Sequence, residues 1–243
     1  MNQNGIVVGR TGMAVALQSA ILLYSDRSST QFATVHSILQ GPDERPVIGP
    51  GRPVDRKALL TALSELQANT APKAEFLPAT VIGVSPMAVT WWAPPAMRRV
   101  FFKCEELGER SAVVPHPGLV FQASNESFFV FALEGTDRPT QETPLFEPPY
   151  FNTWDFGSIC IGSARVPKRI DVASIAGWEA GFFESAFTHP NHGKKRVAYQ
   201  DGHYAFWRDM LDGKFGETFP RETLVSMGHT VGELVSGKLG RFA

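Results

Sequence analysis

The first fifty residues alternate short apolar runs with turn-forming residues. Val, Ile, Leu and Thr are frequent between residues 5 and 40, and the segments GRTG and SDRSST interrupt them. Short runs rich in β-branched residues and bounded by Gly, Ser and Asp are typical of strands joined by turns. The pattern predicts two or three antiparallel strands, which make residues 1–50 a β-rich N-terminal extension.

A Pro- and Gly-rich segment, GPDERPVIGPGRP, follows at residues 41–53. Its density of turn-forming residues predicts a loop. The next residues, 55–67, predict a helix because their leucines recur at the spacing of one helix face. These leucines are Leu59, Leu60, Leu63 and Leu66. The helix would begin a central core, residues 51–187.

Further along, the core has a series of apolar runs: ATVIGV, MAVTWWA, MRRVFFKC, GLVFQA and SFFVFALEG. Each has the length and the β-branched or aromatic content of a short strand, and the turn-forming SNE separates the last two. The passage GTDRPTQETPLFEPP then predicts irregular structure, because proline removes a backbone donor and restricts the residue before it. This order predicts an antiparallel β-meander and then a loop that leads to Cys160.

Helical patterns follow Cys160. In VPKRIDVASIAGWEAGFFESAF, Asp171 is a candidate N-cap, and Glu179 interrupts an otherwise apolar face. That face consists of Val172, Ile175, Ala176, Phe183, Ala186 and Phe187. Near the C-terminus, RETLVSMGHTVGELV is amphipathic, with Thr223 as a candidate helix start. We expect residues 188–243 to form a mainly helical extension packed on the core, so the fold class is α+β with flanking helices.

Charge and hydropathy exclude two classes of partner. Lys and Arg total 23 and Asp and Glu total 24, so the chain lacks the positive field that draws proteins to nucleic acid or to anionic membranes. No apolar run reaches the roughly 20 residues that span a bilayer, and we interpret MAVALQSAILLYSD as a buried strand rather than a targeting signal. We therefore expect neither nucleic acid nor membrane as a partner.

The chain has two cysteines, Cys104 and Cys160, and their spacing fits neither a zinc site nor a disulfide framework. We expect a cytoplasmic protein without metal or cofactor. His189 and His192 in HPNH lack a third ligand, so we expect a surface loop there. Cys104 ends a predicted strand, where cysteine usually packs as a small hydrophobe. Cys160 is therefore the candidate for chemistry.

The residues around Cys160 resemble the active-site segment of ubiquitin-conjugating enzymes. The shared pattern is N-x4-G-x-I-C-I, formed by Asn152, Gly157, Ile159, Cys160 and Ile161, and the asparagine precedes the cysteine by eight residues in both. The strand order, the FEPP segment and the following helix also match that family over residues 55–187. More specifically, the chain resembles the bacterial family called PRTRC system protein B, a branch of prokaryotic conjugating enzymes.

This sequence departs from the family pattern near the cysteine. Tyr150 and Phe151 stand where the family has His-Pro, and Gly162 and Ser163 replace an acidic residue that often follows the cysteine. A His-Pro-Asn does occur at residues 189–191. It follows the cysteine instead of preceding it, so we interpret it as unrelated to the family motif.

The resemblance implies that Cys160 carries a ubiquitin-like modifier as a thioester and passes it to an amine. It implies a β-grasp modifier, an adenylating activating enzyme and a metallo-isopeptidase in the same system as partners. Sulfur suits this role because a thiolate is both a strong nucleophile and a good leaving group.

The resemblance also assigns roles to the residues before the cysteine. Asn152 would donate to the oxyanion or brace the loop that does, so its removal should slow discharge to an amine more than loading. Gly157 would allow a backbone conformation or a close approach that a Cβ would block. Tyr150 and Ser163 complete the supporting active-site loop.

Two other classes of function stay open. A cysteine hydrolase would pair Cys160 with His189 or His203, and sequence distance does not forbid either pairing. An inactive conjugating-enzyme variant would bind a ubiquitin-like protein or scaffold a complex, as the loss of His-Pro suggests. The presence of both Asn152 and Cys160 argues against this second alternative.

Overall fold

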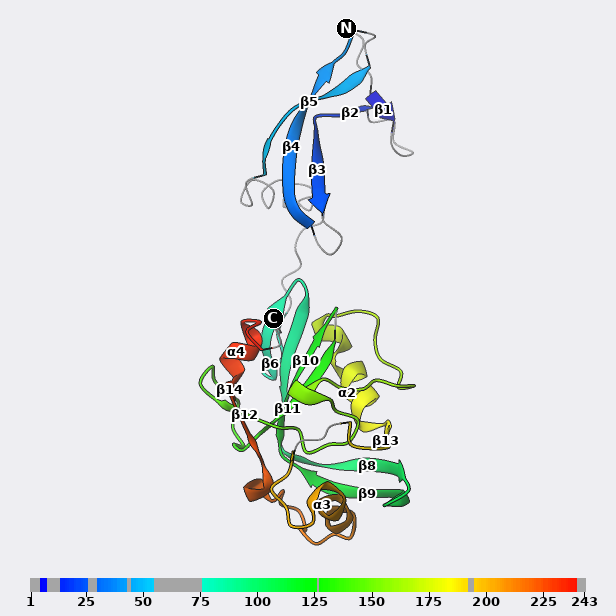
Figure 1. Ribbon diagram of the computed structural model, residues 1–243, viewed down its shortest axis with the longest axis vertical. Coiled ribbons are helices and arrows are strands. Elements are labelled where there is room, and N and C mark those ends of the chain that lie inside the picture. The colour runs from blue at the N-terminus through cyan, green and yellow to red at the C-terminus, as the bar shows by residue number, and fades with distance from the viewer. Residues whose placement is uncertain are drawn as a thin grey trace. The chain divides into compact units, whose positions relative to one another are not determined.

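The computed structural model divides the chain into two units, residues 1–75 and 76–243 (Figure 1). It describes residues 5–7, 14–25, 30–42, 45–54, 76–125, 127–191 and 195–239. The sequence analysis placed the first boundary at residue 50. The observed unit is longer because residues beyond 50 pair with its sheet. The helix predicted at residues 55–67 lies outside the described residues.

The described part of the N-terminal unit is made of antiparallel strands. Strand β1 (Gly5–Val7) pairs with β2 (Ala14–Ala16). A separate sheet has the order β3-β4-β5. Its strands are β3 (Ser19–Ser25), β4 (Thr30–Gln40) and β5 (Pro46–Pro53).

Strand β5 corrects the loop that was predicted for residues 41–53. Pro46 and Pro53 lie at its two ends, and the strand is at the edge of the sheet, where proline is tolerated. The pairing of β4 with β5 shifts between His36 and Ile38, so Pro50 falls at the irregularity. A bulge leaves a residue out of the ladder, so the missing N–H of Pro50 costs no ladder bond.

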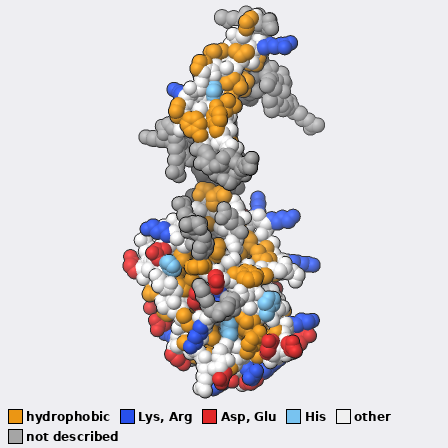
Figure 2. Space-filling view, viewed as in Figure 1, with side chains coloured by type: hydrophobic (Ala, Val, Ile, Leu, Met, Phe, Trp, Pro, Cys, Tyr) orange, Lys and Arg blue, Asp and Glu red, His pale blue; other side chains and the backbone are white. Residues whose placement is uncertain are grey.

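The N-terminal sheet keeps its large apolar side chains at the surface. Among its described side chains only Thr34 and His36 are buried. Figure 2 shows apolar side chains over this unit, and the large exposed ones are Leu17, Ile21, Leu23, Tyr24, Phe32, Leu39, Val47 and Ile48. The hydrophobic core of the described chain therefore lies in the second unit.

The second unit is built on a six-stranded antiparallel sheet with the order β14-β12-β11-β10-β7-β6. The bounds are β6 (Val81–Ser85), β7 (Ala88–Ala93), β10 (Gly118–Ser124), β11 (Phe128–Leu133), β12 (Pro144–Phe146) and β14 (Ser226–Thr230). The central strands β10 and β11 are almost entirely buried, as their apolar sequences require.

A long hairpin forms a second sheet. Strands β8 (Ala96–Cys104) and β9 (Gly108–His116) pair along their whole length, and β13 (Ala186–Phe187) adds to β8 in parallel. Strand β7 pairs directly with β10, so this hairpin leaves the order of a simple meander. The sequence analysis did not single out β9, because GERSAVVPH begins with polar residues and contains a proline.

The helix after Cys160 packs its aromatic residues on the main sheet. Asp171 caps η2 (Val172–Ser174) through a reciprocal capping box with Ser174, and α2 (Ile175–Phe183) continues from it. Asp171 is thus the N-cap that the sequence predicted. Glu179, which interrupted the apolar face, accepts a hydrogen bond of 2.9 Å from the indole N–H of Trp91. The buried indole N–H of Trp91 is therefore paired, by a carboxylate that is itself only half-buried.

The described C-terminal residues contribute helices that pack on the core and also a strand of the main sheet, which the sequence analysis did not predict. Helix α3 (Gly202–Leu211) buries Phe206 and Trp207 in the same core as the sheet. After η3 (Arg221–Thr223), strand β14 pairs with β12 at the edge of the main sheet. Helix α4 (Val231–Val235) follows, capped by Thr230. The predicted helix start at Thr223 is wrong, because the residues after it satisfy their backbone groups by strand pairing.

Described helices do not cross a membrane: none of them is long and apolar enough.

Candidate active site

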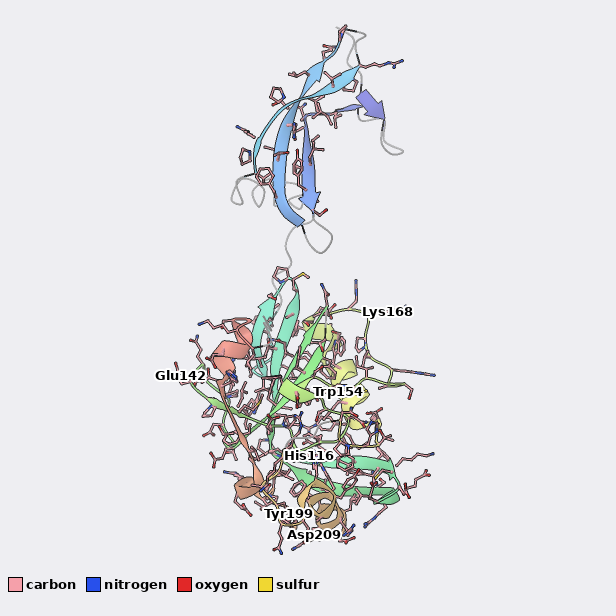
Figure 3. All side chains as sticks on the ribbon, in the orientation of Figure 1. His116, Glu142, Trp154, Lys168, Tyr199 and Asp209 are labelled. Carbon is pink, nitrogen blue, oxygen red and sulfur yellow. The ribbon has the colours of Figure 1, made fainter. Side chains whose placement is uncertain are left out.

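The segment from Asn152 to Cys160 is a tight, closed loop. Thr153 and Ile159 form an antiparallel bridge, and the N–H of Cys160 donates to the carbonyl of Asn152 at 2.7 Å. The short η1 turn (Asp155–Gly157) forms the tip. Figure 3 labels Trp154, which lies in this loop. The eight-residue spacing therefore makes Asn152 and Cys160 cross-strand neighbours at the base of the loop.

The loop needs unusual backbone conformations at its base and at its tip. Asn152, Phe156 and Gly157 have φ values of 57°, 59° and 73°, in the left-handed region. A Cβ on Gly157 would lie 2.4 Å from the carbonyl oxygen of Val130 and 2.8 Å from the ring of Phe131. Only glycine fits this contact with β11.

Tyr150 supports the loop from inside the core and does not line a pocket with Cys160. Its side chain is fully buried, and its hydroxyl lies 2.7 Å from Nδ1 of His116. Burial, together with the nearby Arg98, lowers the pKa of His116 to about 3, and burial raises the pKa of Tyr150 well above its ordinary value. Both groups are thus neutral at physiological pH, and the hydroxyl of Thr153 donates to the Tyr150 carbonyl at 2.8 Å.

Cys160 opens onto a pocket of about 700 Å³. The pocket is lined by the residues after the cysteine, the C-terminal end of α2, and β13 with the residues that follow it. Seven of the fifteen lining residues are Gly, Ala or Ser: Gly162, Ser163, Ala164, Ala180, Gly181, Ser185 and Ala186. The charged residues are Lys103, Arg165 and Glu184. Such a lining leaves room for a slender chain beside the partly exposed thiol.

Asn152 lines the same pocket and ties its two sides together. Its Nδ2 donates to the carbonyl of Ala186 at 2.8 Å, and its Oδ1 accepts from the N–H and the hydroxyl of Thr188 at 3.0 and 2.9 Å. Its backbone N–H donates to the carbonyl of His189 at 3.0 Å. These bonds brace the loop against residues 186–189, and the second hydrogen of Nδ2 takes no part in them.

A comparison with known protein families identifies the family of the segment that holds this site. Residues 55–227 match the model of Prokaryotic E2 family D, and the matched segment contains the loop, the thiol and the pocket. The chain belongs to prokaryotic E2 family D. The match covers more than half of its residues. No curated protein and no solved structure matches the chain significantly.

In this family D protein, the two histidines proposed as partners of Cys160 lie in different places. His189 is exposed and lines the pocket with Cys160, and its Nδ1 lies 3.0 Å from the Thr188 hydroxyl. His203 does not line the pocket; its Nε2 lies 3.2 Å from the carbonyl of Pro149, and its ring packs against Phe151. The His-Pro-Asn at residues 189–191, interpreted from the sequence as unrelated to the family motif, contributes its histidine to the pocket.

Cys104 lies apart from this pocket. It is the last residue of β8, where it pairs with Gly108, and it packs against the buried core cluster. It is a free thiol, as is Cys160. Within the described ranges, no group of three or more His, Cys, Asp and Glu side chains is arranged to hold a metal ion.

Arg196 is a buried residue that the sequence analysis did not single out. Its guanidinium donates to Glu147 at 2.7 Å and to Asp155 at 3.1 Å, and its side chain is 1% exposed. Burial lowers the pKa of Arg196, and the two carboxylates oppose that shift. This ion cluster joins the segment before the loop to the loop tip. The exposed Lys195 and the buried Arg196 are adjacent basic residues, so no local signal distinguished the buried one.

Proposed function

We propose that this family D protein carries a ubiquitin-like modifier as a thioester on Cys160 and passes it to an amine acceptor. The main support is the closure of one loop that brings Asn152 and Cys160 to the same pocket, in a chain of an E2 family. The partly exposed thiol and the small lining side chains suit the entry of an extended C-terminal tail. We assign the chain to the PRTRC system protein B branch of this family.

The chemistry has two steps with different demands. In loading, the Cys160 thiolate attacks the thioester of the activating enzyme, and one thiol replaces another. Exchange between similar thiols needs no strong activation of the attacking sulfur. In discharge, an amine attacks the Cys160 thioester and the thiolate leaves. Asn152 braces the loop in both steps.

The resemblance to conjugating enzymes implies the partners that we propose. A β-grasp modifier supplies the acyl group, an adenylating enzyme activates it with ATP, and a metallo-isopeptidase reverses the product bond. The protein would work in the cytoplasm, where thiols stay reduced.

The test uses the two free thiols as a matched pair. With the modifier, the activating enzyme and ATP, we expect a reducible adduct on the wild-type protein and on Cys104→Ser, and none on Cys160→Ser, when non-reducing gels are compared. Cys104 is the control because it lies in β8, outside the pocket. A reducible band that survives Cys160→Ser and disappears with Cys104→Ser would reverse the assignment.

One observation favours a second candidate function, a cysteine hydrolase. His189 lines the pocket with Cys160, as a thiol–imidazole pair would require. A hydrolase would cleave an activated ester or thioester without ATP and without an activating enzyme. Turnover of a small thioester by the isolated protein, lost in Cys160→Ser, would favour this function over conjugation.

A further inference from the structure

The hydrogen bonds around Thr188 determine which nitrogen of His189 is basic. The Asn152 amide is oriented by two groups of known polarity. Its Nδ2 faces the Ala186 carbonyl, which can only accept, and its Oδ1 faces the Thr188 N–H, which can only donate. Oδ1 is therefore an acceptor for the Thr188 hydroxyl, which lies 2.9 Å away.

A hydroxyl has one hydrogen to donate, and Thr188 gives it to Asn152. The contact of 3.0 Å between Thr188 Oγ1 and Nδ1 of His189 then requires an N–H on Nδ1. A neutral imidazole has one N–H, so the lone pair that accepts a proton is on Nε2. Asn152 and Thr188 thus select the tautomer of His189.

The same asparagine also holds the backbone of Cys160. Its backbone N–H bonds to the carbonyl of His189, and its backbone carbonyl accepts from the N–H of Cys160. The backbones of His189 and Cys160 are therefore anchored to one residue, and both residues line one pocket. This arrangement has no counterpart for His203, which contacts the Pro149 carbonyl.

We propose that His189 is the catalytic base of the discharge step, with Thr188 and Asn152 as its positioning residues; this rests on the proposed function. The amine nitrogen attacks the thioester carbonyl carbon and forms the C–N bond. A proton of that nitrogen moves to Nε2 of His189. The electrons of the C–S bond return to the sulfur of Cys160, which leaves as thiolate, and the imidazolium later releases its proton to water.

Discharge needs this base more than loading does. Loading exchanges one thiol for another of similar acidity, and no nitrogen-bound proton has to be removed. Aminolysis must remove a proton from the attacking nitrogen, and a positioned base assists that transfer. The base role therefore predicts a defect confined to discharge.

The tautomer can be measured without any partner. In ¹⁵N-edited NMR spectra of the full chain, we expect the neutral His189 ring to carry its proton on Nδ1. Thr188→Val keeps the side-chain shape and removes the hydroxyl, so it should mix the two tautomers, and Thr188→Ser should restore the wild-type spectrum. A proton on Nε2 in the wild type, or an unchanged spectrum in Thr188→Val, would overturn the selection of the His189 tautomer by Thr188 and Asn152.

The base role is tested on preloaded protein. The modifier, prepared as a C-terminal thioester of mercaptoethanesulfonate, is exchanged onto Cys160, and single-turnover discharge to free lysine is followed. We expect His189→Ala to load normally and to discharge about 10²-fold more slowly, at the lower end of what general bases contribute. Added imidazole should restore part of the rate, which a purely structural role of the ring would not allow.

His229→Ala is the matched control. His229 is a partly exposed histidine of β14 that contacts Glu233, and it does not line the pocket. It should load and discharge as the wild type does. Equal discharge of His189→Ala and wild type would overturn the base role and leave the thioester carrier standing. The lack of any adduct on Cys160 would overturn the proposed function and the base role together.

Discussion

Gly157 is the residue whose replacement should disturb the loop most. Its φ of 73° disfavours any side chain, and an added Cβ would lie 2.4 Å from the Val130 carbonyl oxygen. Gly108, the first residue of β9, has the same φ of 73°, but nothing lies within 4 Å of an added Cβ. The two glycines therefore separate backbone strain from overpacking.

We expect Gly108→Ala to lower the free energy of unfolding by about 1–2 kcal/mol, the cost of a left-handed residue with a Cβ. Gly157→Ala should lose about 1–3 kcal/mol more, because β11 or the loop must also move. Urea unfolding followed by tryptophan fluorescence measures both. Equal losses in the two variants would show that the contact with Val130 relaxes freely.

At the scale of elements, short-range patterns predicted much and long-range contacts were missed. Some features depend only on residues close in sequence and could therefore be predicted. These are the apolar runs of β10 and β11 and the cap at Asp171. The eight-residue spacing likewise reflects a local closed loop. Thr188 and His189 reach the loop only because β13 adds to β8, a pairing between residues about eighty-five positions apart. No local pattern encodes that pairing.

Arg196 connects the loop tip to the segment before the loop through its two ion pairs. Arg196→Ala removes the positive charge that Glu147 and Asp155 face, with the guanidinium itself 1% exposed. Breaking a buried ion pair costs about 3–5 kcal/mol. Because Asp155 is half exposed, we expect the free energy of unfolding to fall by about 3 kcal/mol, the lower end of that range.

Arg110→Ala provides the comparison for Arg196→Ala in the same urea titration. Arg110 bonds to Asp212 at the surface, where both side chains are substantially exposed. Such pairs contribute about 0–1 kcal/mol. If the two arginine variants lose equal stability, the buried cluster does not anchor the loop.

At the scale of the whole molecule, the two units can be followed separately. All of the chain's tryptophans, Trp91, Trp92, Trp154, Trp178 and Trp207, belong to the second unit. Tryptophan fluorescence therefore reports the unfolding of the unit that holds Cys160. This matters because a chain of two units need not unfold in one step.

The buried pair of His116 and Tyr150 should make the second unit sensitive to acid. The folded-state pKa of His116 is about 3, below the value of 6.5 for an unperturbed histidine, because burial and then Arg98 disfavour its charged form. Between pH 6.5 and 3 the unfolded chain binds a proton at this residue that the folded chain does not. The free energy of unfolding therefore falls as the pH falls through this window, by up to roughly 1.4 kcal/mol per pH unit.

His116→Gln removes this titration and keeps an amide near the Tyr150 hydroxyl. We expect the variant to be less stable than the wild type at neutral pH, because it loses the ring packing against Tyr150 and Phe183. Its free energy of unfolding should decline less steeply between pH 6 and 4.5, because glutamine does not titrate. The carboxylates that titrate in this range are the same in both proteins, so they contribute equally to the two slopes. Urea titrations across that range, read by tryptophan fluorescence, measure the two slopes. Parallel slopes would mean that His116 is protonated in the folded protein as readily as in the unfolded chain, and that the support beneath the Cys160 loop carries a charge in acid.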